Sequence, residues 1–234
     1  MTNFLFDVDG TLTGSRKTIV KTFKDFFLSW MVGQQGLGNK VFLVTGSDKQ
    51  KTIEQVGQDL WSSTDGSYQN CGNQLFSDGE LIKESEWQLS GGLEVSVKNE
   101  ITNSVWNGTA GSNIERRIGM ANMSTIGRDC TDDQRSHYYE WDQEWKERDF
   151  IVSRLSNDYP EIEFSIGGEI SIDIYPKGKD KSQVLNDIDG ETIFFGDRCI
   201  EGGNDFSIAT KSNLFYNVSG YKEVKAILQR DYTV

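Results

Sequence analysis

The sequence contains few of the residues that usually build metal and nucleophile sites. It has a single histidine, His137, so a histidine-rich metal site is excluded and serine–histidine chemistry would depend on this residue alone. Its three cysteines, Cys71, Cys130 and Cys199, lie far apart and form no metal-binding pair. An odd number of separated cysteines is typical of a reducing compartment, and we therefore expect a cytoplasmic protein.

Long apolar runs and a positive charge are also missing. The apolar runs are too short to span a bilayer, and the N-terminus lacks the regions of a signal peptide, so we expect no membrane partner. The net charge is −12, which argues against a nucleic-acid partner because phosphate backbones require a basic surface. The same charge would repel an anionic substrate unless positive residues gather locally.

One stretch near the N-terminus, residues 4–13, carries a chemical pattern. It is an apolar run that ends in Asp7 and Asp9, followed at once by Gly10. This predicts a buried strand that delivers both carboxylates to the carboxyl edge of a sheet, where open α/β sheets bind ligands. Asp7 is then placed to act as a nucleophile and hard-metal ligand, and Asp9 as an acid or base. The alternatives are a helix-capping loop and a calcium loop, but the glutamate that completes an EF-hand loop is absent.

The order of predicted elements is that of an α/β protein with an insertion. Helical spacing at 17–32, a strand at 40–45 and a helix at 49–60 give the alternation of a parallel sheet. Asp78 and Gly79 between apolar flanks indicate a hairpin. The core pattern resumes at 180 with a helix to 187, a strand at 192–196 and a closing helix–strand–helix.

The segment between these parts has a mixed pattern. It predicts a helix near 93–105, a strand region at 116–126, a helix from a capping box at Thr131 to about Ser156, and strands at 161–166 and 169–175. Helix and antiparallel-looking strands together indicate an α+β module inserted into the core.

Polar residues follow the predicted strands at four separated points. These are Asp7 with Asp9, Thr45 with Ser47 and Asp48, Lys181, and Asp197 with Asn204 and Asp205. In a parallel sheet these ends lie together at one edge. Phosphoryl transfer needs such a set, namely a carboxylate that attacks phosphorus, a metal, a hydroxyl and an ammonium that hold oxygens, and a second carboxylate that moves the proton. Taken singly, Thr45 and Lys181 also fit a strand-end threonine and a solvated helix lysine.

These motifs, in this order, resemble the four motifs of the haloacid dehalogenase-like (HAD) superfamily of phosphoryl-transfer enzymes. Longer strings resemble the eukaryotic-type phosphomannomutase family more specifically. They lie at residues 4–16, 46–48, 124–128, 164–173 and 196–205, from Phe-Asp-Val-Asp-Gly-Thr-Leu-Thr to Gly-Gly-Asn-Asp.

The resemblance implies an α/β fold with a HAD-like Rossmannoid parallel-sheet core, at residues 1–83 and 180–234, and an inserted α+β cap at 84–179. It implies interconversion of mannose 6-phosphate and mannose 1-phosphate, as in GDP-mannose biosynthesis, with Mg²⁺ and a hexose 1,6-bisphosphate activator. It also implies a hexose phosphate partner and a homodimer through the cap.

The resemblance carries roles onto individual positions of this sequence. The catalytic residues are Asp7, Asp9, Thr45 and Lys181, and the metal ligands are Asp7, the Asp9 backbone carbonyl and Asp197. The substrate-binding residues are Arg16, Arg117, Arg128, Arg135, Ser171 and Asp173.

The chain departs from the family pattern at four positions. Ile118 stands where the family has asparagine, Thr125 replaces proline, and Lys179 replaces tryptophan. Thr45 stands where the family usually has glycine, as in sugar phosphatases of the superfamily. A sugar-phosphate phosphatase therefore remains an alternative, and a phosphosugar-binding module with an inactive core is a third reading.

Overall fold

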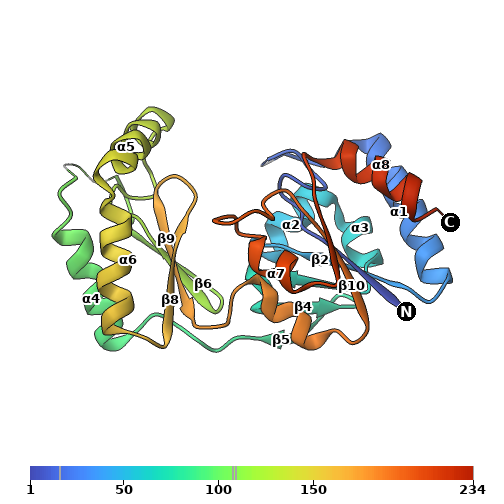
Figure 1. Ribbon diagram of the computed structural model, residues 1–234, viewed down its shortest axis with the longest axis horizontal. Helices are drawn as coiled ribbons and strands as arrows, with labels where there is room; N and C mark the ends of the chain where they lie inside the picture. The colour runs from blue at the N-terminus through green and yellow to red at the C-terminus, as the bar shows by residue number, and fades with distance from the viewer. Residues whose placement is uncertain (16, 107, 109, 234) are drawn as a thin grey trace. The chain divides into compact units, whose positions relative to one another are not determined.

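The computed structural model describes residues 1–15, 17–106, 108 and 110–233. Within them the chain divides into two compact units, Met1–Glu84 with Lys179–Val234, and Ser85–Gly178 (Figure 1). We call these the core unit and the cap unit. Among the described residues, no helix has the length and hydropathy needed to cross a bilayer.

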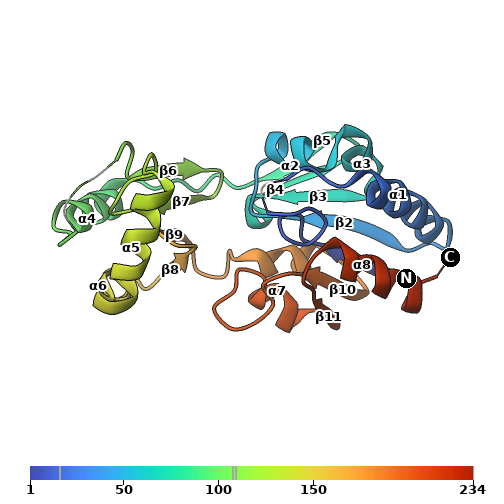
Figure 2. The ribbon, with the colours of Figure 1, turned by 90° about the horizontal axis from the view of Figure 1, so that it is seen from above.

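The core unit is built on a seven-stranded sheet with the order β11-β10-β1-β2-β3-β4-β5. Neighbouring strands from β11 to β3 are parallel, as β2 and β3 illustrate in Figure 2, whereas β4 and β5 form an antiparallel edge. The strands are β1 Thr2–Phe6, β2 Lys40–Val44, β3 Gly66–Gln69, β4 Gln74–Ser77, β5 Glu80–Glu84, β10 Glu191–Gly196 and β11 Leu214–Asn217.

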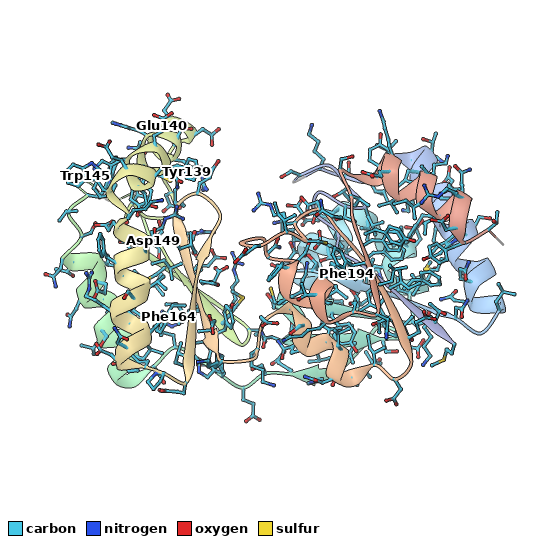
Figure 3. All side chains as sticks on the ribbon, in the orientation of Figure 1. Tyr139, Glu140, Trp145, Asp149, Phe164 and Phe194 are labelled. Carbon is cyan, nitrogen blue, oxygen red and sulfur yellow. The ribbon has the colours of Figure 1, made fainter. Side chains whose placement is uncertain are left out.

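Alternate residues of the central strands face two different layers. Phe4 and Phe6 pack with α1, α2, α3 and α8, whereas Leu5 and Phe194 pack with α7 and the 3₁₀ helix η2. This is the alternation expected of a strand that is buried on both faces. Figure 3 shows Phe194 inside the core unit. The helices are α1 Lys21–Gly36, α2 Lys49–Val56, α3 Gln58–Ser63, η1 Asn70–Gly72, η2 Lys181–Asp187, α7 Phe206–Lys211 and α8 Tyr221–Asp231.

Local chemistry explains where the core elements differ from the sequence-based predictions. The predicted helix at 49–60 is divided by Gly57, whose φ of 89° no right-handed helix contains. The segment after Asp180 forms a 3₁₀ helix, and α1 starts at Lys21 and continues to Gly36. The hairpin prediction is confirmed, since Asp78 and Gly79 have φ values of 51° and 82°, as a two-residue turn of type I′ requires.

The cap unit is a four-stranded antiparallel sheet, with the order β6-β7-β9-β8, and three helices. The predicted strand region at 116–126 corresponds to a hairpin of two strands, which starts at residue 114 and ends at residue 123. The elements are α4 Gly91–Thr102, β6 Ile114–Arg117, β7 Met120–Met123, α5 Asp132–Trp145, α6 Glu147–Asp158, β8 Ile162–Gly167 and β9 Ser171–Pro176.

The two faces of the cap sheet have different chemistry. One face carries Met123, Phe164 and Ile172, which pack against α4 and α6; Figure 3 shows Phe164 beside α6. Because strand side chains alternate, the residues between these positions, such as Asn122 and Asp173, lie on the opposite face. The opposite face therefore carries polar side chains.

The predicted long helix of the cap is two helices. The capping box is confirmed, since Thr131 accepts from the Gln134 backbone N–H and the Gln134 side chain accepts from that of Thr131. Lys146 is left-handed, with a φ of 55°, and ends α5 before α6 begins. The two helices consequently run in different directions (Figure 1).

Candidate active site

The carboxyl ends of β1, β2 and β10 meet at one edge of the core sheet. Asp7 directly follows β1, and its backbone N–H donates to the carbonyl of Phe195 in β10 at 2.9 Å. Thr45 follows β2, and Asp197 follows β10. Because β1 lies between β2 and β10, the parallel register brings the three predicted site residues to the same edge.

Lys181 links the acidic residues of this edge. Its Nζ donates to Asp7 Oδ1 at 2.5 Å and to Asp205 Oδ1 at 2.6 Å. Its side chain is 1% exposed, so the alternative of a solvated helix lysine is wrong. Asp180 fixes the start of this segment, because its carboxylate accepts from the backbone N–H of Ser182 at 2.7 Å.

Burial and charge shift the titration of this group. Burial raises the pKa of Asp7 to about 7, while Lys181 opposes the rise and Asp205 adds to it. Burial alone would lower the pKa of Lys181, but Asp205 and Asp7 outweigh burial and raise it. Burial and the carboxylate of Asp205 raise the pKa of Asp197. The carboxylates thus repel one another, and a bound cation would relieve that repulsion.

The carboxylates are arranged so that they could hold such a cation. Oxygens of Asp7, Asp197 and Asp205 lie within 4.8 Å of one another. An all-oxygen donor set of this kind suits Mg²⁺, which prefers carboxylates and water. Gly10 leaves room for the Asp197 carboxylate, because a Cβ at Gly10 would collide with it. The φ of Gly10, 92°, also favours glycine.

The carboxylate cluster has one member that the metal-site prediction did not name. The prediction used Asp7, the Asp9 carbonyl and Asp197, whereas the clustered carboxylates include Asp205. Asp205 stood in the quoted Gly-Gly-Asn-Asp string, so the signal was present. Asp205 lies several residues after the end of β10, so the sequence did not predict that its carboxylate accepts a hydrogen bond from Lys181.

Asp9 and Thr45 have other neighbours. The Asp9 carboxylate accepts a hydrogen bond from Gln55 Nε2 at 2.8 Å, and Asp9 also forms a bridge with Thr13. Thr45 is buried, and its hydroxyl oxygen accepts from the Ser47 backbone N–H at 3.1 Å. Gln55 was not predicted, because a single glutamine within a helix gives no sequence signal.

A second cluster of predicted residues lies in the cap unit, around Arg128. The Arg128 guanidinium donates to Ser171 Oγ at 2.9 Å and to Asn122 Oδ1 at 3.1 Å, and pairs with Glu115 at 2.7 Å. Arg117 donates to the other Glu115 oxygen at 2.8 Å. Each guanidinium presents paired donors of the kind that bind phosphate, although a carboxylate now accepts from both.

Asp173 joins this cluster through Asn122. Asn122 Nδ2 donates to Asp173 Oδ1 at 2.5 Å, and burial raises the pKa of Asp173. Glu115 and Asn122 were not predicted. Each of them follows or precedes an apolar strand residue, Ile114 or Met123, so the alternation of side chains could have placed Glu115 and Asn122 on the polar face.

One predicted arginine, Arg135, stands apart from this cluster. Arg135, in the first turns of α5, pairs with Glu169 at 3.6 Å. Arg16 lies outside the described residues. The structure thus brings together Arg117, Arg128, Ser171 and Asp173 in the cap unit, and Asp7, Lys181 and Asp197 in the core unit.

The fold defines the general class of the protein. It is similar to the solved structure of a HAD subclass IIB sugar phosphatase, with a TM-score of 0.59 and 15% identity over 98% of each chain. The fold is therefore that of the HAD superfamily.

Sequence comparison defines the family within this class. The family model for eukaryotic phosphomannomutase matches residues 35–232. Phosphomannomutase 1 of Dictyostelium discoideum is 37% identical, covering 88% of this chain and 85% of that protein. Phosphomannomutase of Drosophila melanogaster is 31% identical, covering 98% and 89%. The chain therefore belongs to the eukaryotic phosphomannomutase family of enzymes, as the sequence motifs predicted.

Proposed function

We propose that the protein is a Mg²⁺-dependent phosphomannomutase that interconverts mannose 6-phosphate and mannose 1-phosphate. The observation that carries the proposal is the buried contact of Lys181 with Asp7 and Asp205, beside Asp197. An ammonium and several carboxylates at one strand edge suit phosphoryl transfer to a carboxylate. The relatives in this family supply the choice of sugar.

In this mechanism Asp7 and Asp9 divide the chemistry. An Asp7 oxygen attacks the phosphorus of a sugar phosphate, the bond between phosphorus and the sugar oxygen breaks, and Asp9 gives that oxygen a proton. In the return half, Asp9 takes the proton from a sugar hydroxyl as its oxygen attacks the aspartyl-phosphate. Lys181 and Thr45 hold the phosphoryl oxygens.

The metal and the activator complete this proposal. Asp7, Asp197 and the Asp9 carbonyl, with Asp205 close by, would hold Mg²⁺. When bound, Mg²⁺ offsets the charge shared by the carboxylate and the phosphoryl group. A hexose 1,6-bisphosphate would phosphorylate Asp7 first, so that each turnover starts from the phosphorylated enzyme.

The cap cluster would bind the distal phosphate of the same sugar. Arg117 and Arg128 offer the fork-shaped donors, and Ser171 and Asp173 can bind the sugar hydroxyls. A phosphate would replace the Glu115 carboxylate as acceptor. Arg135 and Arg16 belong to this proposal through the family resemblance, as do a homodimer formed through the cap and a cytoplasmic location.

Covalent labelling of Asp7 tests the proposal. We expect a hexose 1,6-bisphosphate with Mg²⁺ to phosphorylate the wild-type protein at Asp7, as found by mass spectrometry of peptides. Asp7→Asn should prevent labelling and abolish turnover while the fold is retained, because the amide is nearly the same shape but a poor nucleophile. Labelling at another residue, or unchanged activity after exhaustive chelation, would refute it.

One observation favours a second function. Thr45 offers a buried side chain at the end of β2, where the family usually has glycine. Such a residue is found in sugar phosphatases of the superfamily, in which water discharges the aspartyl-phosphate. Release of inorganic phosphate at the rate of substrate consumption would favour the phosphatase over the mutase.

A further inference from the structure

The side chain of Gln55 connects α2 to the loop that carries Asp9. Gln55 is buried, with 5% of its surface exposed. Its Nε2 lies 2.8 Å from Asp9 Oδ1 and 3.5 Å from Thr13 Oγ1. Its backbone carbonyl accepts from the N–H of Ile19 at 2.8 Å, so the residue is anchored at both ends.

The neighbours of Gln55 permit one orientation of its amide. An ionised Asp9 carboxylate can only accept hydrogen bonds. The hydroxyl of Thr13 donates to the Val8 carbonyl at 3.1 Å, so it too presents an acceptor to Gln55. Both groups that face the amide therefore require its NH₂, and the opposite orientation would bring acceptor against acceptor.

This orientation leaves the other end of the amide unsatisfied. Gln55 Oε1 is buried, and no described residue donates a hydrogen bond to it. A buried acceptor without a partner is unfavourable, and most such groups in folded proteins are paired. The hydrogen bond to Asp9 therefore fixes which end of the Gln55 amide faces the Asp9 carboxylate.

We propose that Gln55 is a positioning residue for Asp9, holding its carboxylate where it exchanges a proton with the sugar oxygen. The inference rests on the proposed role of Asp9 as acid and base. Loss of the amide donor removes a hydrogen bond that orients the Asp9 carboxylate, so the proton transfer slows while sugar binding is untouched. The phosphorylation of Asp7 is then impaired only when the leaving group needs a proton.

The test compares two phosphoryl donors in the wild type, Gln55→Met and Gln55→Glu. A hexose 1,6-bisphosphate releases an alkoxide that must be protonated, whereas acetyl phosphate releases acetate, which needs no proton. Gln55→Met keeps the length of the side chain, and Gln55→Glu keeps its shape but, when ionised, cannot donate. Gln50→Met is the matched control, because Gln50 is an exposed residue of the same helix and donates to Glu54.

We expect both Gln55 variants to slow phosphorylation by the bisphosphate about 10- to 100-fold, a part of the usual effect of an acid or base. Phosphorylation by acetyl phosphate should change less than about threefold, KM for mannose 6-phosphate should stay within about twofold, and kcat should carry the loss. The stabilisation of each variant by Mg²⁺, measured as the rise in Tm, should equal that of the wild type.

Equal losses with both donors, a loss confined to KM, or no loss in either variant would overturn the inference. If the wild type does not accept acetyl phosphate, the steady-state constants test the inference instead: a loss in kcat supports it and a loss confined to KM overturns it. If Gln55→Met does not fold, Gln55→Glu decides. Failure of the proposed function is distinguishable, because it would appear in the wild type, as missing label on Asp7.

Discussion

At the scale of single residues, the candidate active site depends on the buried ammonium group of Lys181. Lys181 contacts Asp7 and Asp205 and is almost inaccessible to solvent. Removing one member of a buried ion pair leaves the other charge uncompensated, which costs more than the pair contributes. We therefore expect Lys181 to affect both stability and, in the proposed mechanism, turnover.

Replacing this lysine should show both effects. We expect Lys181→Met to destabilise the metal-free protein by about 3–5 kcal/mol and to lower kcat about 10²- to 10³-fold. Urea unfolding and a steady-state assay measure the two quantities. Lys211→Met is the control, since Lys211 is exposed and donates to Ser182 Oγ in the same segment. Retention of kcat within about threefold in Lys181→Met would contradict the assigned role.

The raised pKa of Asp7 predicts how stability depends on pH. The folded protein holds the Asp7 proton more tightly than the unfolded chain, because the pKa rises from 3.8 to about 7. This contribution to stability is complete below pH 3.8 and is lost as the pH rises through about 7. The Tm of the chelated wild type should therefore fall more than that of Asp7→Asn between about pH 5 and pH 8, and Mg²⁺ should reduce the fall. Parallel curves for the two proteins would contradict the burial of this carboxylate.

At the scale of elements, the sequence predicted most strands, although not β3, and predicted the breaks between helices poorly. The apolar run before Asp7 and the Asp78–Gly79 turn were sufficient for β1 and the hairpin. The break at Lys146 was not predictable, because a lysine rarely adopts the left-handed conformation without tertiary contacts. An ion pair spans this break, since Arg148 of α6 pairs with Asp142 of α5 at 2.7 Å.

The same ion pair supports the polar face of the cap. Arg148 donates to the carbonyls of Gly168 and Ser171 at 3.0 and 3.3 Å, and Ser171 in turn accepts from Arg128. Asp142 also accepts from the Arg148 backbone N–H at 3.0 Å. The break between α5 and α6 is thereby connected to the arginine cluster of the cap unit.

Breaking the pair should destabilise the cap. We expect Asp142→Ala to lower the free energy of unfolding by about 3–5 kcal/mol, because both side chains are buried. Arg154→Ala removes a largely exposed pair with Glu100 and should cost less than about 1 kcal/mol. Chemical denaturation of both variants measures the difference, and similar values for the two would show that Asp142 has no special role.

At the scale of the whole molecule, the two units carry different halves of the proposed chemistry. The core unit holds the acidic residues and Lys181, and the cap unit holds the arginine cluster. Sequence strings identified most members of both sites. They could not identify Glu115, Asn122 and Gln55, because these side chains matter through tertiary neighbours rather than through a motif.

The arginine cluster should determine how well the sugar phosphate is held. We expect Arg128→Ala and Arg117→Ala to lower kcat/KM roughly 10- to 100-fold, since each charged hydrogen bond contributes about 1.5–3 kcal/mol. A loosely held sugar leaves the aspartyl-phosphate to water, so the share of hydrolysis should rise. Arg135→Ala tests a further arginine of the prediction.

Arg116→Ala is the matched control for this cluster. Arg116 is adjacent in β6 but pairs with Glu94 of α4 on the opposite face of the cap sheet. Its removal should leave kcat/KM and the product ratio unchanged. Wild-type values in all of the Arg117, Arg128 and Arg135 variants would mean that the phosphate site lies elsewhere.

The central claim is that this chain moves a phosphoryl group between two positions of mannose through Asp7. Phosphorus NMR of mannose 1-phosphate, incubated with the protein, Mg²⁺ and a catalytic amount of hexose 1,6-bisphosphate, tests it most directly. We expect the mannose 6-phosphate signal to grow as the mannose 1-phosphate signal declines, and Asp7→Asn to give no change. Inorganic phosphate as the sole product, or mannose 6-phosphate formed equally by Asp7→Asn, would contradict it.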